Sequence, residues 1–154
     1  MNKPAPPQSH RLRKGRFSEI GRAYLLTTVT CQRKPVFENF RVGRLVVNEL
    51  RWASVQGLAD TLAFVLMPDH LHWLIVLREG TLESLARTVK SRSAITINRE
   101  FEWRGPIWQA GFHDHALRRD EDVKTMARYV VANPLRAGLV QRIGDYPLWD
   151  AVWL

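Results

Sequence analysis

Hydrophobic and polar positions along the chain follow a strand period in some segments and a helix period in others. Residues 23–31, AYLLTTVTC, are rich in β-branched and aromatic side chains, which favours a strand. Residues 61–67 (TLAFVLM) and 71–77 (LHWLIVL) are apolar runs of strand length. Because the turn-forming pair Pro68-Asp69 separates them, they predict an antiparallel hairpin.

Three other segments repeat their apolar residues at helical spacing. Residues 40–56 form the first of them, and a glycine follows as a plausible stop. The second is residues 81–101, which open on a threonine that can cap a helix. The third is residues 120–132. Residues 112–117, between the last two, predict a fourth strand.

The order of these elements predicts the fold class. Strand, helix, strand, strand, helix, strand and helix match an α+β, ferredoxin-like split βαβ fold: an antiparallel sheet with helices on one face, plus a C-terminal helix. The other sheet face would be free for a ligand. The chain has 154 residues, the size of one domain. We expect residues 23–154 to form that domain and residues 1–22, rich in proline and basic side chains, to be a flexible arm.

Composition narrows the class of partner. Lys and Arg number 23 against 15 Asp and Glu, which gives a formal charge of +8. This balance is typical of nucleic-acid-binding proteins, although anionic membranes and acidic proteins also fit. The single cysteine, Cys31, excludes an intramolecular disulfide and a multi-cysteine zinc finger. No apolar run approaches the roughly 20 residues of a membrane span, so we expect a cytoplasmic protein with no membrane partner.

Two histidine pairs are candidates for a metal site. Residues two apart share a face of a strand, so His70 and His72 project together, about 6.6 Å apart along the chain. Two imidazoles on one face can bind one divalent cation. An arbitrary pair of this kind is nevertheless more often two hydrogen-bonded polar residues near a strand end. His113 and His115 have the same spacing in the predicted fourth strand, so spacing alone cannot choose between the pairs.

The third predicted helix adds a phenol and an amide. Tyr129 and Asn133 lie one helical turn apart at the edge of the apolar stripe, so they face the same place. Ordinary structural roles are more common for such residues: Tyr129 as a packing aromatic, and Asn133 as an N-cap before Pro134. Pro134 also disfavours helical backbone at Asn133, which would distort this geometry.

Several motifs together resemble one family. The segments MPDHLHWLIVL, IWQAGFHDHALR and ARYVVANPLRAGLV follow the basic lead-in SHRLRKGRFSEIGRAYLLTT. Over residues 10–148 this set resembles the REP-associated tyrosine transposases, relatives of single-tyrosine HUH transposases. The resemblance implies a single-strand DNA endonuclease and strand transferase that acts on hairpins of repetitive extragenic palindromes (REPs) through a covalent 5′-phosphotyrosine. It implies that His70 and His72 bind a metal, that Tyr129 is the nucleophile and that Asn133 is a third ligand.

Two imidazoles and one amide oxygen leave coordination positions open for phosphate oxygens. Mixed nitrogen and oxygen ligation suits a divalent ion such as Mg²⁺ or Mn²⁺. The partner would be single-stranded or hairpin DNA. We expect basic side chains of the arm and of the second helix to contact its phosphates: Arg11, Arg13, Lys14, Arg16, Lys90, Arg92 and Arg99. A monomer is favoured, with a homodimer as the alternative.

Other interpretations stay open at this point. The chain could be a non-catalytic ferredoxin-like nucleic-acid-binding protein, or a metallonuclease that uses a metal-activated water. Most of the six tryptophans are expected in the core, but some, such as Trp73 and Trp108, could stack on unpaired bases.

Overall fold

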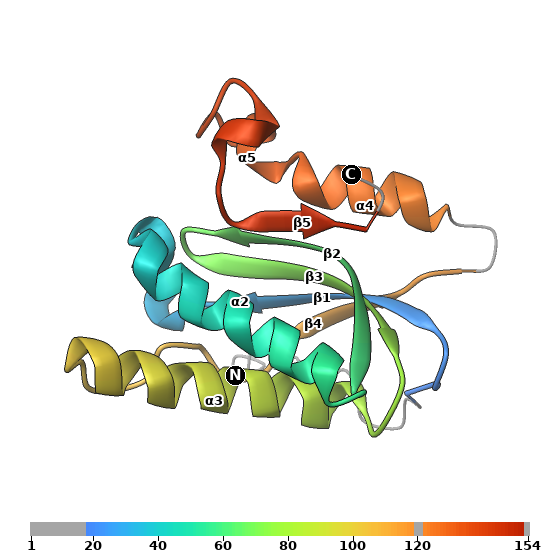
Figure 1. Cartoon of the computed structure of the whole chain (residues 1–154), viewed down its shortest axis with the longest axis horizontal. Helices are drawn as coiled ribbons and strands as arrows, with labels where there is room; N and C mark the ends of the chain where they lie inside the picture. The colour runs from blue at the N-terminus through green and yellow to red at the C-terminus, as the bar shows by residue number, and fades with distance from the viewer. Residues whose placement is uncertain (1–17, 119–121, 153–154) are drawn as a thin grey trace, which may run out of the picture.

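A five-stranded antiparallel sheet organises the chain in the computed structural model, which describes residues 18–118 and 122–152 (Figure 1). The sheet order is β4-β1-β3-β2-β5, with the strands β1 (Ala23–Val29), β2 (Ala59–Met67), β3 (His70–Leu77), β4 (His113–Ala116) and β5 (Trp149–Ala151). The helices are α2 (Phe40–Val55), α3 (Leu82–Phe101), α4 (Val123–Val131) and the single turn α5 (Asn133–Arg136). Among the described helices, none is long and apolar enough to cross a membrane.

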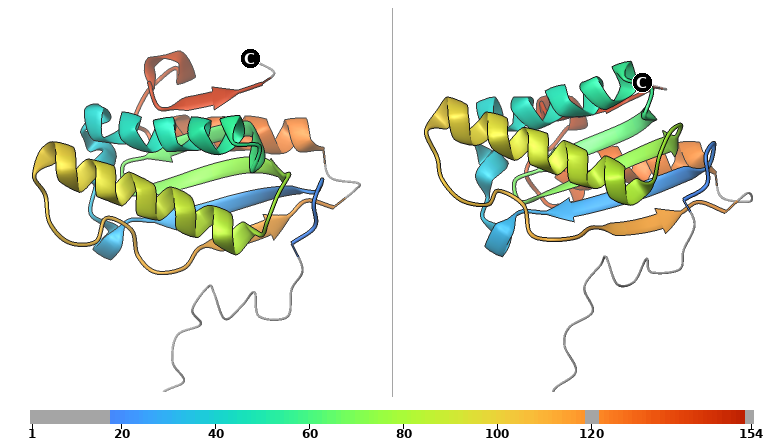
Figure 2. Two further views of the ribbon diagram at one scale, coloured as in Figure 1. Left: turned by 60° about the horizontal axis from the view of Figure 1, so that its bottom comes forward. Right: turned by 90° about the horizontal axis from the view of Figure 1, so that it is seen from below.

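Strand register separates the two faces of the sheet. His72 pairs with Thr27 on β1 and with Val65 on β2, so these three side chains share one face. Leu71 pairs with Leu66, and both face the other way. Helices α2 and α3 cover the Leu71 face, since a glycine of α2 lies beside the Leu66 side chain, whereas α4 lies on the other face and packs against β2 and β3 (Figure 2). The predicted fold is confirmed, and α4 covers part of the face that was expected to be free.

The hydrophobic core fills the space between the sheet and helices α2 and α3, and buried residues of α4 extend it on the other face of the sheet. Alternate residues of β3, from Leu71 to Leu77, are buried on the side of α2 and α3, as a period of two predicts. Arg92 on α3 joins the two helices, because its Nε donates to Glu49 Oε2 at 2.7 Å. Its guanidinium carbon also lies 3.7 Å from the centre of the Trp52 ring. The Arg92 side chain therefore helps to pack α3 against α2.

The predicted boundary of the N-terminal arm falls in a segment that contacts the sheet. Residues 1–17 lie outside the described part of the chain. Ser18 Oγ accepts a hydrogen bond from the backbone N–H of Leu82 at 3.0 Å, and the N–H of Gly21 donates to the Leu77 carbonyl at 2.7 Å. Residues 18–22 are thus attached to the fold, and the flexible arm stays a prediction for the residues before them.

The last strand, β5, was not among the predicted elements. Its three residues, Trp149–Ala151, are too few to show an alternation. Backbone and side-chain bonds tie this part of the chain to β2: the N–H of Leu66 donates to the Leu148 carbonyl at 2.9 Å, and the Tyr146 hydroxyl donates to the Leu66 carbonyl. Burial raises the pKa of Tyr146 to about 12, so this hydroxyl keeps its proton at neutral pH.

Tyr146→Phe tests how firmly this segment is anchored. We expect the free energy of unfolding to fall by about 1–3 kcal/mol, because the Leu66 carbonyl loses its hydroxyl donor in a buried place. Urea denaturation measures the change. The matched variant is Tyr24→Phe. The Tyr24 hydroxyl accepts a hydrogen bond from the backbone N–H of Glu19, an exposed residue, so its removal should lower the free energy of unfolding by less. Equal unfolding midpoints for Tyr146→Phe and the wild type would contradict the prediction.

Candidate active site

His70 and His72 lie at the start of β3, on the face that carries α4. Their ring centres are 4.8 Å apart and the ring planes meet at 81°. His70 Nδ1 lies 2.7 Å from Asp69 Oδ1, and His72 Nδ1 lies 2.8 Å from Thr27 Oγ1. Both bonds involve Nδ1, which leaves the Nε2 atoms for another partner. Metal-binding histidines are commonly oriented by such a bond to the second ring nitrogen.

The charges around the pair favour neutral imidazole at His72 and ionised carboxylate at Asp69. Burial, followed by the charges of His70 and Arg136, lowers the pKa of His72 to about 4. Burial alone would raise the pKa of Asp69, but its hydrogen bonds and charge interactions with His70 and Arg33 outweigh this effect and leave that pKa below its usual value. At neutral pH His72 is therefore uncharged, as a metal ligand must be.

Tyr129 projects from α4 into solvent. Its side chain is 57% exposed, so it is not a packing aromatic. The guanidinium carbon of Arg136 lies 3.9 Å from the centre of the Tyr129 ring, and Arg136 Nη2 donates to the Tyr129 carbonyl at 2.9 Å. The charge of Arg136 is also one of the causes that lower the pKa of His72, after burial and the charge of His70. The sequence analysis did not identify Arg136.

Asn133 folds its side chain back onto the end of α4. The amide nitrogen donates to the Val130 carbonyl at 2.8 Å and to the Tyr129 carbonyl at 3.4 Å. The residue is not the N-cap of the next turn, a position that Ala132 occupies. Both bonds use the amide nitrogen, so neither commits the amide oxygen, the atom that would bind a cation.

The second histidine pair faces the same side of the sheet. Thr27 pairs with His72 on β3 and with His113 on β4, so His113 and His115 share the face of the first pair. Both are exposed on the edge strand. Among residues 18–118 and 122–152, no three His, Cys, Asp or Glu residues are grouped so that they could hold a metal ion. The amide of Asn133 stays the predicted third ligand of the His70–His72 pair.

The basic residues predicted to contact DNA fall into two groups. Arg11, Arg13, Lys14 and Arg16 lie outside the described residues. Lys90, Arg92 and Arg99 belong to α3, on the face opposite to the histidine pair (Figure 2). The Lys90 ammonium donates to the carbonyls of Gln109 and Gly111 at 2.7 and 2.6 Å, and burial lowers its pKa. Lys90 and Arg92 thus have structural partners within the protein. Phosphate contact by the basic residues of α3 and of the N-terminal segment stays a prediction.

Two tryptophans considered for base stacking belong to the core. Trp73 is buried and its Nε1 donates to Thr61 Oγ1 at 2.9 Å. Trp108 is also buried, donates to Ser93 Oγ at 2.9 Å and packs its ring 5.2 Å from that of Phe37. Neither ring has a face available to a nucleotide.

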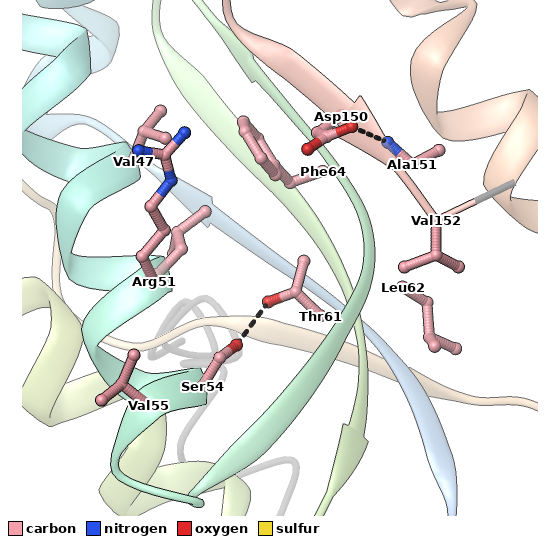
Figure 3. Close-up of a pocket in the computed structure, with 11 residues that line it drawn as sticks. Val47, Arg51, Ser54, Val55, Thr61, Leu62, Phe64, Asp150, Ala151 and Val152 are labelled. Atoms are coloured by element: carbon pink, nitrogen blue, oxygen red, sulfur yellow. Dashed lines mark hydrogen bonds between the residues drawn. The ribbon is translucent and has the colours of Figure 1, made fainter. Parts of the chain in front are cut away.

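A groove of about 560 Å³ lies elsewhere, between α2 and the β2–β5 edge of the sheet (Figure 3). Its walls include Arg51, Phe64 and Asp150 but none of the predicted site residues. Beside Tyr129 there is a shallow hollow of about 370 Å³, which Asp122, Thr125 and Met126 also line. Neither histidine of β3 lines either hollow, so of the predicted site residues only Tyr129 borders one.

In sequence, the chain is similar to transposases. A family model described as "Transposase IS200 like" matches residues 21–133. The chain is 28% identical over 116 residues to a protein of Haemophilus influenzae assigned as a REP-associated tyrosine transposase, with 66% of each chain covered. It is 29% identical over 85 residues to the REP-associated tyrosine transposase of Escherichia coli K12, covering 55% of this chain and 50% of that protein. The matches thus span about half to two thirds of these relatives.

In structure, the chain shares its fold with solved transposases. A REP-associated tyrosine transposase bound to a REP hairpin superposes with a TM-score of 0.67 at 23% identity, covering 87% of this chain and 79% of that chain. A protein of Deinococcus radiodurans R1 assigned as a transposase superposes with a TM-score of 0.55 at 20% identity, covering 87% and 97%. The family match begins before β1 and extends through Asn133, so it contains both histidines of β3 and Tyr129. The resemblance drawn from the motifs is confirmed, and the chain belongs to the IS200-like transposase family.

Proposed function

We propose that the chain is a metal-dependent single-strand DNA endonuclease and strand transferase that acts on REP-type hairpin DNA through a covalent 5′-phosphotyrosine. The observation that carries this proposal is that the histidine pair and the helix bearing the exposed phenol of Tyr129 lie on one face of the sheet, with the guanidinium of Arg136 stacked over the phenol ring. The phenol of Tyr129 is exposed to solvent, and the net charge of +8 favours a polyanion.

The residues present fit a divalent cation such as Mg²⁺ or Mn²⁺. His70 and His72 would bind it through Nε2, since Asp69 and Thr27 are bonded to the Nδ1 atoms, and Asn133 would add its amide oxygen. A cation held there would polarise the scissile phosphate and neutralise the charge that develops on it.

The proposed reaction is a phosphoryl transfer to Tyr129. The phenol oxygen attacks the phosphorus, a bond forms between them, and the bond from phosphorus to the 3′ oxygen breaks. The phenol loses its proton and the departing 3′ oxygen gains one. The protein then holds the 5′ phosphate as an ester, and a free 3′ hydroxyl remains. Because a phosphodiester is retained, a 3′ hydroxyl from another end can attack it and join strands without ATP.

We propose that the protein acts as a monomer, with a homodimer as the alternative. The histidine pair of β3 and the helix that carries Tyr129 lie on the same sheet face of one chain, which is the arrangement that a monomeric site requires. The described helices include no membrane span, which fits action on DNA in the cytoplasm.

A covalent adduct is the product that tests the proposal. An oligonucleotide with a REP-type hairpin and a single-stranded flank, labelled at its 3′ end, is incubated with the protein and Mg²⁺ or Mn²⁺. We expect a labelled protein band on a denaturing gel, and no such band when a chelator is present. Cleavage that leaves free 5′-phosphate ends would instead indicate a metallonuclease that uses water. Binding without cleavage would indicate a non-catalytic DNA-binding protein.

Thr27→Val tests the orientation of His72. The valine keeps the shape of the side chain but removes the hydroxyl bonded to Nδ1, so we expect the Mn²⁺ concentration for half-maximal adduct formation to rise about 10- to 100-fold. Thr27→Ser retains a hydroxyl and should behave like the wild type. Thr28→Val is the matched control, since Thr28 lies on the other face and its Oγ1 is buried without a partner. An equal Mn²⁺ requirement in Thr27→Val and Thr28→Val would rule out this role for Thr27.

A further inference from the structure

In the part of the chain that the structure describes, no carboxylate balances the charge of Arg136. Within the described part of the chain no Asp or Glu forms an ion pair with it, whereas Arg33, Arg78 and Arg92 each pair with one. Its hydrogen bond to the Tyr129 carbonyl uses Nη2. A guanidinium has five N–H donors in a planar fork that matches a phosphate, so most donors of Arg136 remain available.

The local fold explains why Arg136 reaches Tyr129. The two residues are seven positions apart, which is close to two turns of a helix. Ala132 has helical dihedral angles and links α4 to α5, so the chain continues in nearly helical form past Pro134. Arg136 therefore returns to the side of the helix that carries Tyr129, and its guanidinium stacks over the ring.

We propose that Arg136 is a phosphate-binding residue of the active site: it holds the Tyr129 ring in the DNA-free protein and binds the DNA phosphate beside the phenol in the complex. This inference rests on the proposed function. It assigns two roles to one side chain. The flat guanidinium positions the ring by stacking, and the charge together with the free N–H donors attracts the phosphate.

DNA binding without cleavage tests the phosphate contact. The affinity for a fluorescent REP-type hairpin with a single-stranded flank is measured by anisotropy in chelator, at several salt concentrations. We expect Arg136→Gln to reduce the slope of log affinity against log salt by about 0.7 to 0.9, the value for one lost phosphate contact. The matched control is Arg44→Gln, an exposed arginine of α2 on the other side of the sheet, which should leave the slope unchanged.

Fluorine NMR tests the stacking in the DNA-free protein. The chain has three tyrosines, so 3-fluorotyrosine gives three resonances, and Tyr129→Phe identifies that of Tyr129. We expect Arg136→Gln to shift only this resonance. Arg136→Lys separates the two roles: it should restore the salt slope, because the charge is retained, but not the resonance, because an ammonium does not stack in this way.

The outcomes distinguish this inference from the proposed function. A wild-type adduct together with an unchanged salt slope in Arg136→Gln overturns the role of Arg136 alone. A reduced slope without any wild-type adduct supports the phosphate contact and overturns the proposed reaction. Equal slopes in Arg136→Gln and Arg44→Gln, or a Tyr129 resonance that does not respond to Arg136→Gln, also overturn the inference.

Discussion

Tyr129→Phe should abolish the covalent protein–DNA adduct, because the phenol oxygen that would bond to phosphorus is missing. The substitution keeps the ring that Arg136 covers, and an exposed side chain should not be needed for folding. DNA affinity in chelator should therefore stay close to that of the wild type. The measurement is the denaturing gel with a 3′-labelled hairpin, run beside the anisotropy titration, so that lost chemistry is separated from lost binding.

The other two tyrosines provide the control for this result. Tyr24 and Tyr146 are buried, at 2% and 5% exposure, and both hydroxyls have partners. Tyr24→Phe makes the same chemical change in the core and should retain the adduct. Persistence of the adduct in Tyr129→Phe would exclude Tyr129 as the nucleophile and require a different attacking group.

The sequence predicted the elements that have a clear period and enough length. The apolar runs of β2 and β3 and the stripes of α2 and α3 appear within a few residues of the predicted positions. The last strand, Trp149–Ala151, was missed because it depends on pairing with β2, a contact distant along the chain that three residues cannot reveal. Helix α4 begins at Val123, later than predicted, because Asp122 supplies its N-cap.

The site was predictable only where a local period fixes it. A period of two placed His70 and His72 on one face, but only the strand register shows that His113 and His115 share that face through Thr27. Arg136 carried one signal, its seven-residue spacing from Tyr129. The proline between them argued against a continuous helix and concealed that signal.

Predicted phosphate contacts show a limit of composition. Lys90 was chosen because it lies on the polar side of a helix, yet its ammonium binds two backbone carbonyls that precede β4. Arg92 likewise pairs with Glu49 and covers Trp52. The sequence of an amphipathic helix therefore shows which residues are basic but not which groups their side chains contact. Those groups lie on segments distant in sequence.

Replacing both histidines of β3 tests the proposed metal ligands. In the double variant His70→Ala with His72→Ala, adduct formation should fall by about a hundredfold to a thousandfold or more, since a metal ion contributes several kcal/mol of charge stabilisation. The double variant should also lose Mn²⁺ binding. Electron paramagnetic resonance of free Mn²⁺ measures this directly, in the absence of DNA and without any catalytic step.

The second histidine pair is the matched control, because it has the same spacing and lies on the same face of the sheet. His113→Ala with His115→Ala removes two imidazoles from the edge strand and should retain Mn²⁺ binding and the adduct. The two pairs differ in their supports: Asp69 and Thr27 are bonded to the Nδ1 atoms of the β3 pair and leave Nε2 available. If the β4 variant lost Mn²⁺ binding while the β3 variant kept it, the cation would belong to β4, and Tyr129 would need another partner to react with DNA.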